Sequence, residues 1–176
     1  MRRRLFVLRH AKSSWDDPGL PDHERPLAPR GRRAVELLAE HVRRHEIHPT
    51  QILCSTSRRT RETLDGVIGN GERLIEPELY SATAEEVLAR LRHVPDDVDS
   101  VMVVGHNPAM QMLVLRLASR DAANDANDER RHLADVQRKF PTGALATLTF
   151  ECDWSQLAWG CAHLVALVRP KKLKPS

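Results

Sequence analysis

Aromatic residues and long apolar runs are both scarce in this chain. Phenylalanine, tryptophan and tyrosine make up only 4% of its 176 residues, which argues against a surface where aromatic side chains alternate with basic ones to bind nucleic acid. No stretch approaches the length of 18 apolar residues that a membrane-spanning helix needs. The first apolar run, residues 5–8, is also too short for the core of a signal peptide. We therefore expect neither nucleic-acid nor membrane partners.

Cysteines are few as well, which limits both disulfide and metal chemistry. Cys54, Cys152 and Cys161 are too scattered for a disulfide framework, and none belongs to the CxxC pair typical of structural zinc. A reducing cytoplasm is therefore the expected location. No carboxylates cluster at the spacing of a divalent-cation site. We expect no metal and no cofactor.

Charge gives only a weak indication of the ligand. The formal net charge is +3 and the pI is near 9.0. A modest positive excess suits an anionic ligand, but it does not distinguish phosphate from other anions or from no ligand at all.

Short apolar runs alternate with amphipathic segments along the chain. Strands are predicted at residues 5–8, 51–54, 101–104, 144–150 and 163–168, and helices at 31–44, 59–68, 83–94 and 109–117. This alternation indicates an α/β fold with a mostly parallel central sheet. The connection between the last two strands has no helical period, so we expect those strands to pair antiparallel.

No linker or repeat divides the chain, so residues 1–176 are expected to form a single domain. The most polar stretch is 119–135. Its first half is interpreted as a surface loop and its second half as a short helix.

Charged and polar residues follow three of the predicted strands directly. Arg9 and His10 close the first strand, and His106 follows the strand at 101–104. In parallel sheets, ligands bind at the carboxyl ends of strands. Taken singly, the first pair could mark only where a strand meets water, and His106 is about as consistent with a core histidine bonded to the backbone.

Two helix starts near these strand ends favour an anion. Asn107 and Pro108 are predicted as the N-cap and first residue of the helix that follows His106. The turn at 55–57 opens a helix whose first turn contains Arg58, Arg59 and Arg61. Arginine is unfavourable at a helix N-terminus unless an anion is bound there. The alternative is that these arginines are simply solvated. Two imidazoles and two guanidiniums together suit phosphoryl transfer.

These segments resemble the histidine phosphatase (phosphoglycerate-mutase-like) superfamily. The resemblance rests on Arg9-His10, on Ser55 with Arg59 and Thr63, and on Gly105-His106-Asn107-Pro108. The segments 9–15, 25–27, 30–31, 139–144 and 170–171 are similar to its small SixA-type phosphohistidine phosphatase branch, and the likeness covers roughly residues 4–173.

The resemblance implies a three-layer α/β/α sandwich and a metal-independent mechanism. It makes His10 the nucleophile and places Arg9, Arg59 and His106 around the phosphate, with Arg59 preferred to Arg58. The general acid of larger relatives has no clear counterpart. Glu78 is the nearest candidate, although it could equally be a surface acid.

The function expected from the residues and the resemblance is a metal-independent phosphatase. Its substrate would be protein phosphohistidine, which would connect the chain with signal transduction. The alternatives are a phosphatase or mutase that acts on a small phosphorylated metabolite and, from another class, a non-catalytic phosphate-binding module. The partner is accordingly a phosphorylated protein or a small phosphorylated substrate.

Overall fold

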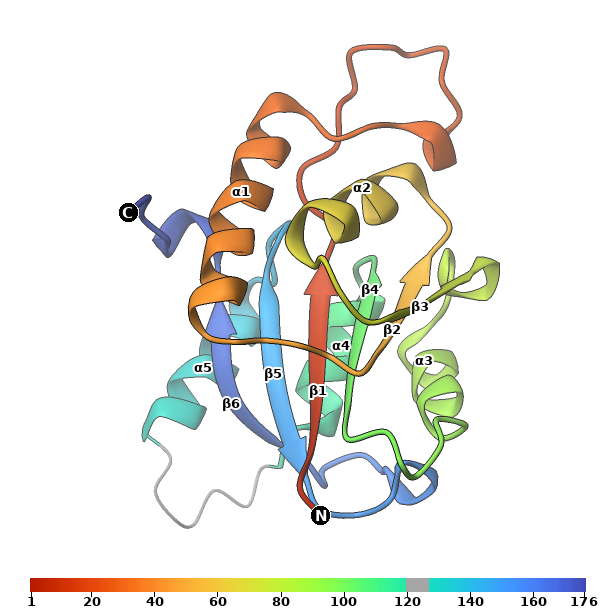
Figure 1. Cartoon of the computed structure of the whole chain (residues 1–176), viewed down its shortest axis with the longest axis vertical. Coiled ribbons are helices and arrows are strands. Elements are labelled where there is room, and N and C mark those ends of the chain that lie inside the picture. The colour runs from red at the N-terminus through yellow and green to blue at the C-terminus, as the bar shows by residue number, and fades with distance from the viewer. Residues whose placement is uncertain (120–126) are drawn as a thin grey trace.

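A six-stranded sheet forms the centre of the computed structural model, which describes residues 1–119 and 127–176 (Figure 1). The strand order is β3-β2-β4-β1-β5-β6. All neighbouring strands from β3 to β1 pair parallel, whereas β5 pairs antiparallel with both β1 and β6. The strands are β1 (Arg3–Arg9), β2 (Gln51–Ser55), β3 (Glu72–Glu76), β4 (Ser100–Gly105), β5 (Leu145–Phe150) and β6 (His163–Val168).

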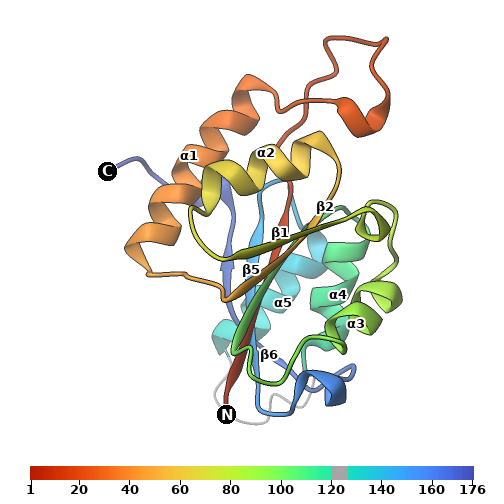
Figure 2. The same cartoon turned by 45° about the vertical axis from the view of Figure 1, so that its right-hand side comes forward.

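Helices cover both faces of this sheet (Figures 1 and 2). One core lies under α1 and α2, and the other lies under α3, α4 and α5. Strand β1 serves both cores because its side chains alternate: Leu5 and Val7 face one, and Phe6 and Leu8 face the other. The helices are α1 (Pro29–Arg44), α2 (Arg58–Val67), α3 (Ala84–Leu91), α4 (Ala109–Leu117) and α5 (Asn127–Arg138).

The expected three-layer α/β/α sandwich with a mostly parallel sheet is therefore confirmed, as is the antiparallel pairing of the last two strands. Short 3-10 helices lie in the connections, namely η1 (Asp22–Glu24), η2 (Pro77–Leu79), η3 (Trp154–Gln156) and η4 (Pro170–Lys172). None of the helices in the described parts of the chain is both long and apolar enough to span a bilayer.

Three features differ from the sequence-based expectation. Strand β3 was not predicted, because its residues are mostly polar and it pairs only with β2 at the edge of the sheet. The helix that follows His106 begins at Ala109 with Pro108 at the N-cap, not with Asn107 there. Helix α5 continues to Arg138, beyond residue 135, while the loop expected in the first half of 119–135 falls largely on 120–126, outside the described residues.

At the carboxyl edge of the sheet, the connections that follow β1 and β4 lead to opposite faces. These two strands are neighbours, with Arg9 opposite Gly105. The chain after β1 leads to α1 on one face, whereas the chain after β4 leads to α4 on the other. Such a switch point is where open α/β sheets bind their ligands.

Candidate active site

Two histidines meet at the carboxyl ends of β1 and β4. His10 follows β1 directly, and its backbone N–H donates to the carbonyl of Gly105 at 3.1 Å. His106 is the next residue after Gly105. The centroids of the two imidazole rings are 5.3 Å apart. The register of β1 against β4 thus brings together two side chains that are far apart in the sequence.

His10 is held as a neutral imidazole in a defined tautomer. Its side chain is buried, and Nδ1 lies 2.7 Å from the carbonyl oxygen of Ala11. A carbonyl can only accept, so Nδ1 carries the proton and Nε2 keeps its lone pair. Burial, aided by the charges of His106, Arg59 and Arg9, lowers the pKa of His10 to about 3. The free Nε2 is therefore available as a nucleophile at neutral pH.

His106 stands between a hydroxyl and a guanidinium. Its Nε2 lies 2.8 Å from Ser55 Oγ, and its Nδ1 lies 3.4 Å from Arg59 Nη2. Because a guanidinium can only donate, Nδ1 accepts here and Nε2–H donates to Ser55. Burial, followed by the charge of Arg59, lowers the pKa of His106 to about 4. An anion beside this ring would act in the opposite direction and favour the imidazolium.

Arg59 points into the site from the first turn of α2. It is only 7% exposed, and its guanidinium donates to the backbone carbonyl of Asp22 at 2.8 Å and to Asp22 Oδ2 at 3.0 Å. Its neighbour Arg58 is exposed and pairs with Glu62 on the outside of the helix. Adjacent helical residues differ in direction by about 100°, which explains why the two arginines separate.

Arg9 contributes a second guanidinium. Its Nη1 donates to the carbonyl of Phe140 at 3.0 Å, an oxygen that also accepts from Asn107 Nδ2 at 2.9 Å. Burial and the positive charge of Arg59 lower the pKa of Arg9. The Nε atoms of Arg9 and Arg59 are buried and have no hydrogen-bond partner within 1–119 and 127–176. Two neighbouring cations with unsatisfied donors favour an anionic ligand.

Two polar side chains in the site, Asp22 and Tyr80, were not singled out in the sequence, and they join Ser55, which belongs to the predicted motif. Asp22, in η1, bonds Arg59 and also accepts from the hydroxyl of Tyr80. The ring of Tyr80 stands edge-on to that of His106, at a centroid distance of 5.4 Å. Ser55 ends β2 and is fully buried. No motif could have identified Asp22 or Tyr80, because each lies in a connection whose place beside α2 and β4 depends on the tertiary fold.

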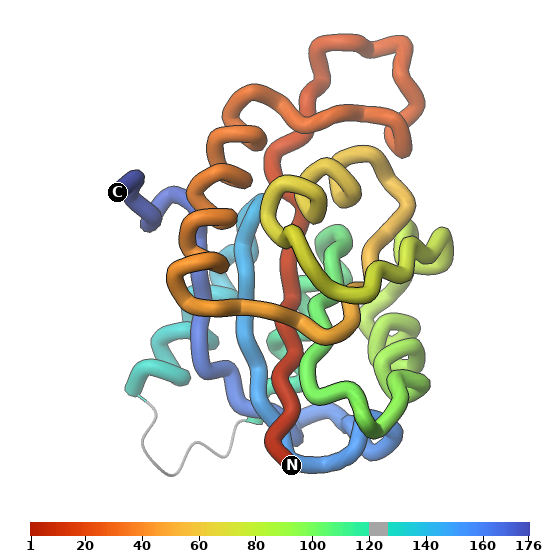
Figure 3. The backbone as a smooth tube through the Cα atoms, in the orientation of Figure 1, coloured from red at the N-terminus to blue at the C-terminus, as the bar shows by residue number. Residues whose placement is uncertain are grey.

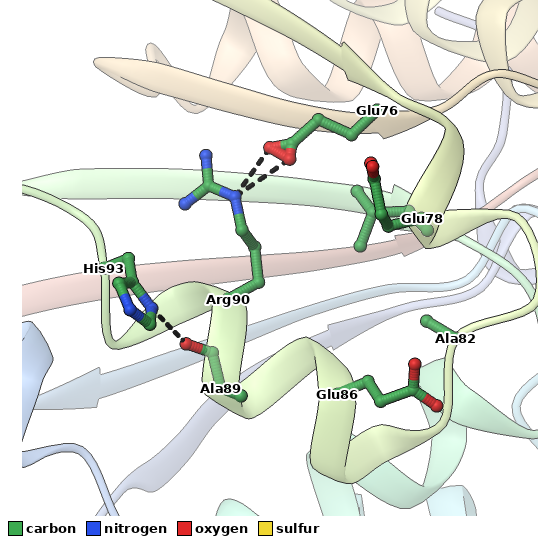
Figure 4. Close-up of a pocket in the computed structure, with 8 residues that line it drawn as sticks. Glu76, Glu78, Ala82, Glu86, Ala89, Arg90 and His93 are labelled. Atoms are coloured by element: carbon green, nitrogen blue, oxygen red, sulfur yellow. Dashed lines mark hydrogen bonds and ion pairs between the residues drawn. The ribbon is translucent and has the colours of Figure 1, made fainter.

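Glu78 does not join the four predicted site residues. It is exposed on η2 and lines a recess with Glu76, Arg90 and His93 (Figure 4). In that recess, Arg90 Nε donates to both carboxylate oxygens of Glu76, at 2.6 and 2.8 Å. Glu78 makes no hydrogen bond or ion pair with any other described residue. The same connection instead supplies Tyr80 to the site.

Within 1–119 and 127–176, no three His, Cys, Asp or Glu side chains form a group that could hold a metal ion. The site contains two imidazoles, two guanidiniums and one carboxylate, that of Asp22. Asp22 is ionised, because its bond from Tyr80 and the nearby Arg59 lower its pKa to about 2. This arrangement can bind an anion and present a neutral nitrogen nucleophile to it.

Comparison with known proteins identifies relatives along almost the whole chain. The family model of the histidine phosphatase superfamily (branch 1) matches residues 5–82. An uncharacterized protein of Mycobacterium tuberculosis is 36% identical over 164 residues, which cover 93% of this chain and 100% of the relative.

Solved structures give the same result for the fold. A candidate phosphohistidine phosphatase SixA from Nakamurella multipartitia superposes with a TM-score of 0.83 at 30% identity, covering 97% of both chains. A candidate SixA from Agrobacterium tumefaciens superposes with a TM-score of 0.77 at 28% identity, covering 96% of this chain and 98% of the other.

Proposed function

The chain belongs to the histidine phosphatase superfamily, in its SixA-type branch, and we propose that it is a metal-independent phosphatase that removes phosphoryl groups from protein phosphohistidine. The observation that carries this proposal is the hydrogen bond from His10 Nδ1 to the carbonyl of Ala11. It fixes a neutral imidazole whose Nε2 is free, beside His106 and Arg59.

In the first chemical step, Nε2 of His10 attacks the phosphorus in line with the leaving group. A phosphorus–nitrogen bond to His10 forms while the bond from phosphorus to the substrate nitrogen breaks. The electron pair of the broken bond stays on that nitrogen, and the substrate imidazole leaves as a neutral ring because its other nitrogen already carries a proton. In the second step, water attacks the phosphoryl group on His10, which releases inorganic phosphate and restores the neutral imidazole.

Arg9, Arg59 and His106 hold the non-bridging phosphoryl oxygens in both steps. Their charge and hydrogen bonds oppose the negative charge that spreads over these oxygens in the transition state. The bonds from Arg59 to Asp22 and from Arg9 to the carbonyl of Phe140 fix the two guanidiniums before substrate binds. The two fixed guanidiniums supply the positive charge that a metal ion provides in other phosphatases.

Among residues 1–119 and 127–176, no carboxyl group is assigned as a proton donor beside His10, which favours phosphohistidine over a phosphomonoester as the substrate. Asp22, with its pKa near 2, is ionised at neutral pH and cannot act as an acid. Glu78 lies in the recess with Arg90, and the proposal assigns it no role as a general acid. A histidine leaving group departs readily once protonated, which lessens the need for a dedicated general acid. A cytoplasmic location and a phosphoprotein partner are part of the same proposal.

The proposal is tested by comparing substrates on the wild type and on His10→Ala. The substrates are a phosphohistidine-bearing protein, an aryl phosphate and a set of phosphorylated metabolites. We expect kcat/KM for the phosphohistidine protein to exceed the others by at least about tenfold, and all activity to vanish in the variant. A phosphorylated metabolite that is turned over faster would replace the proposed substrate. Binding without any turnover would indicate a phosphate-binding module.

A further inference from the structure

A basic cavity of about 500 Å³ adjoins the phosphate-binding arginine Arg9. Arg9 lines it from the end of β1, and the other basic residues come from four more places in the chain: the loop after β1, the first turn of α1, the end of α5 and the C-terminal segment after β6. Figure 3 shows this C-terminal segment beside α1. The further cations that line the cavity are Lys12, Arg30, Lys139, Arg169, Lys171 and Lys172.

The positive charge of this cavity is largely uncompensated. None of the described residues that line it is acidic. Arg169 pairs with Asp135 at 3.2 Å, but none of the other five cations makes an ion pair with a described residue. Arg30 stands in the first turn of α1, where the helix dipole adds positive potential and where no acidic side chain is present. Cations gathered in one concavity repel each other unless an anion binds between them.

The walls of the cavity are held together by specific packing. Gly143 has a φ of +78°, and a Cβ at this position would lie 2.8 Å from Cγ of Pro170. The turn at 141–144, which follows Lys139, can therefore approach the segment that contains Lys171 closely because residue 143 has no side chain. The backbone N–H of Gly143 also donates to the carbonyl of His10 at 2.9 Å, which connects the wall to the candidate active site.

We infer that this cavity is a second anion subsite, which binds a phosphate or carboxylate group that the substrate carries besides the transferred phosphoryl group. The inference rests on the proposed function, because it assigns Arg9 to the border between the two subsites. Two sources would supply the second anion: an acidic side chain beside the phosphohistidine of a protein, or a further phosphate on a small molecule. Both would be recognised by the same charge-assisted contacts.

Two double variants with the same change of net charge test the subsite. Arg30→Glu with Lys171→Glu alters the cavity, whereas Arg33→Glu with Lys174→Glu alters exposed residues of the same helix and the same C-terminal segment that do not line it. Calorimetry gives the ratio of tripolyphosphate affinity to orthophosphate affinity. We expect this ratio to fall about tenfold in the cavity variant and to stay unchanged in the control. An equal change in both variants would overturn the subsite.

Paired substrates identify the source of the second anion. One pair is a phosphohistidine peptide with acidic or with neutral flanking residues, and the other is a small molecule with two or with one phosphate. The inference predicts that the wild type prefers the more anionic member of at least one pair, and that the cavity variant loses this preference. No preference in either pair contradicts it. If no substrate is turned over, the proposed function fails, while the calorimetric ratio still decides the subsite.

Discussion

At the scale of single residues, the separation of Arg58 from Arg59 is the sharpest feature of the site. Arg59 is buried against Asp22 and His106, while Arg58 is exposed and pairs with Glu62. The sequence shows two equivalent arginines, and the preference for Arg59 came from the spacing in the family motif. The structure supplies a physical reason: Ser57 caps α2 and so sets where the helix begins, which places Arg59 beside Asp22 and His106 and leaves Arg58 exposed.

We expect Arg59→Ala to lower kcat by about 10²-fold or more, because it removes contacts that strengthen in the transition state. Arg59→Lys should recover only part of the rate, since it keeps the charge but loses the planar fork. Arg58→Ala is the matched control and should cost little. Steady-state kinetics of the three variants check this. If Arg58→Ala proves the more damaging change, the assignment of the phosphate contact to Arg59 is wrong.

A second prediction concerns Asp22, whose carboxylate positions Arg59 and repels a bound anion. Asp22→Asn should lower kcat by about tenfold, since the guanidinium loses its ionic anchor. The same change removes a negative charge beside the phosphate, so inhibition by inorganic phosphate should become stronger. Kinetics with phosphate as the inhibitor separate the two effects. A purely structural role for Asp22 would weaken phosphate binding as well.

At the scale of elements, the strands and helices with strong apolar patterns were predictable from the sequence. Residues 163–168 and 109–117 form β6 and α4 as expected. Strand β3 was not predictable, because its Glu-Arg-Leu-Ile-Glu sequence becomes a strand only through pairing with β2. The burial of Arg3 was not predictable either, because in the sequence it is one of three consecutive arginines near the N-terminus. It is buried, and it donates to the carbonyls of Cys152 and Asp96.

A further prediction concerns the stability of the turn that joins Phe140 to β5. Gly143 and Gly160 have nearly the same φ, +78° and +80°, but of these two only Gly143 has atoms within 4 Å of a Cβ built on it. Gly160→Ala should therefore cost only the strain of a left-handed residue, about 1 kcal/mol. Gly143→Ala should cost about 1–3 kcal/mol more, because its Cβ meets Pro170. Urea unfolding measures both, and equal losses would contradict the packing argument.

At the scale of the whole molecule, the sheet order brings the site together. Strand β4 lies between β1 and β2, so residues that follow three strands separated in sequence meet at one edge. The sequence indicated which residues follow strands, but not that β1 and β4 are neighbours with helices on opposite faces. The basic cavity was hidden for a similar reason. In the sequence, Lys171 and Lys172 lie far from Arg30, and only the fold places all three around one cavity.

The buried histidines make the stability of the whole molecule sensitive to acid. In the unfolded chain, His10 has its ordinary pKa of 6.5 and is protonated below that pH. In the folded protein its pKa is about 3, so it is protonated only near pH 3. Its contribution to stability is therefore fully present above pH 6.5 and is lost as the pH falls towards 3, by up to about 1.4 kcal/mol per pH unit. His106 acts in the same direction between pH 6.5 and about 4.

His10→Gln removes one of these contributions. The free energy of unfolding of this variant should rise relative to that of the wild type as the pH falls from 7 to 4. Urea titrations of both proteins at several pH values give this difference directly. A difference that does not change with pH would show that His10 has the same pKa in the folded and the unfolded protein, which would contradict the lowered pKa of the nucleophile.

The proposed mechanism depends on transfer of a phosphoryl group to His10, and trapping the phosphorylated His10 tests it directly. The wild type is mixed with a radiolabelled phosphohistidine protein, quenched in alkaline detergent within milliseconds to seconds, and digested for mass spectrometry. We predict an alkali-stable, acid-labile label on the peptide that contains His10, at Nε2, and no label on His10→Ala. Turnover by the wild type without any label on His10, or a label on another residue, would contradict the account.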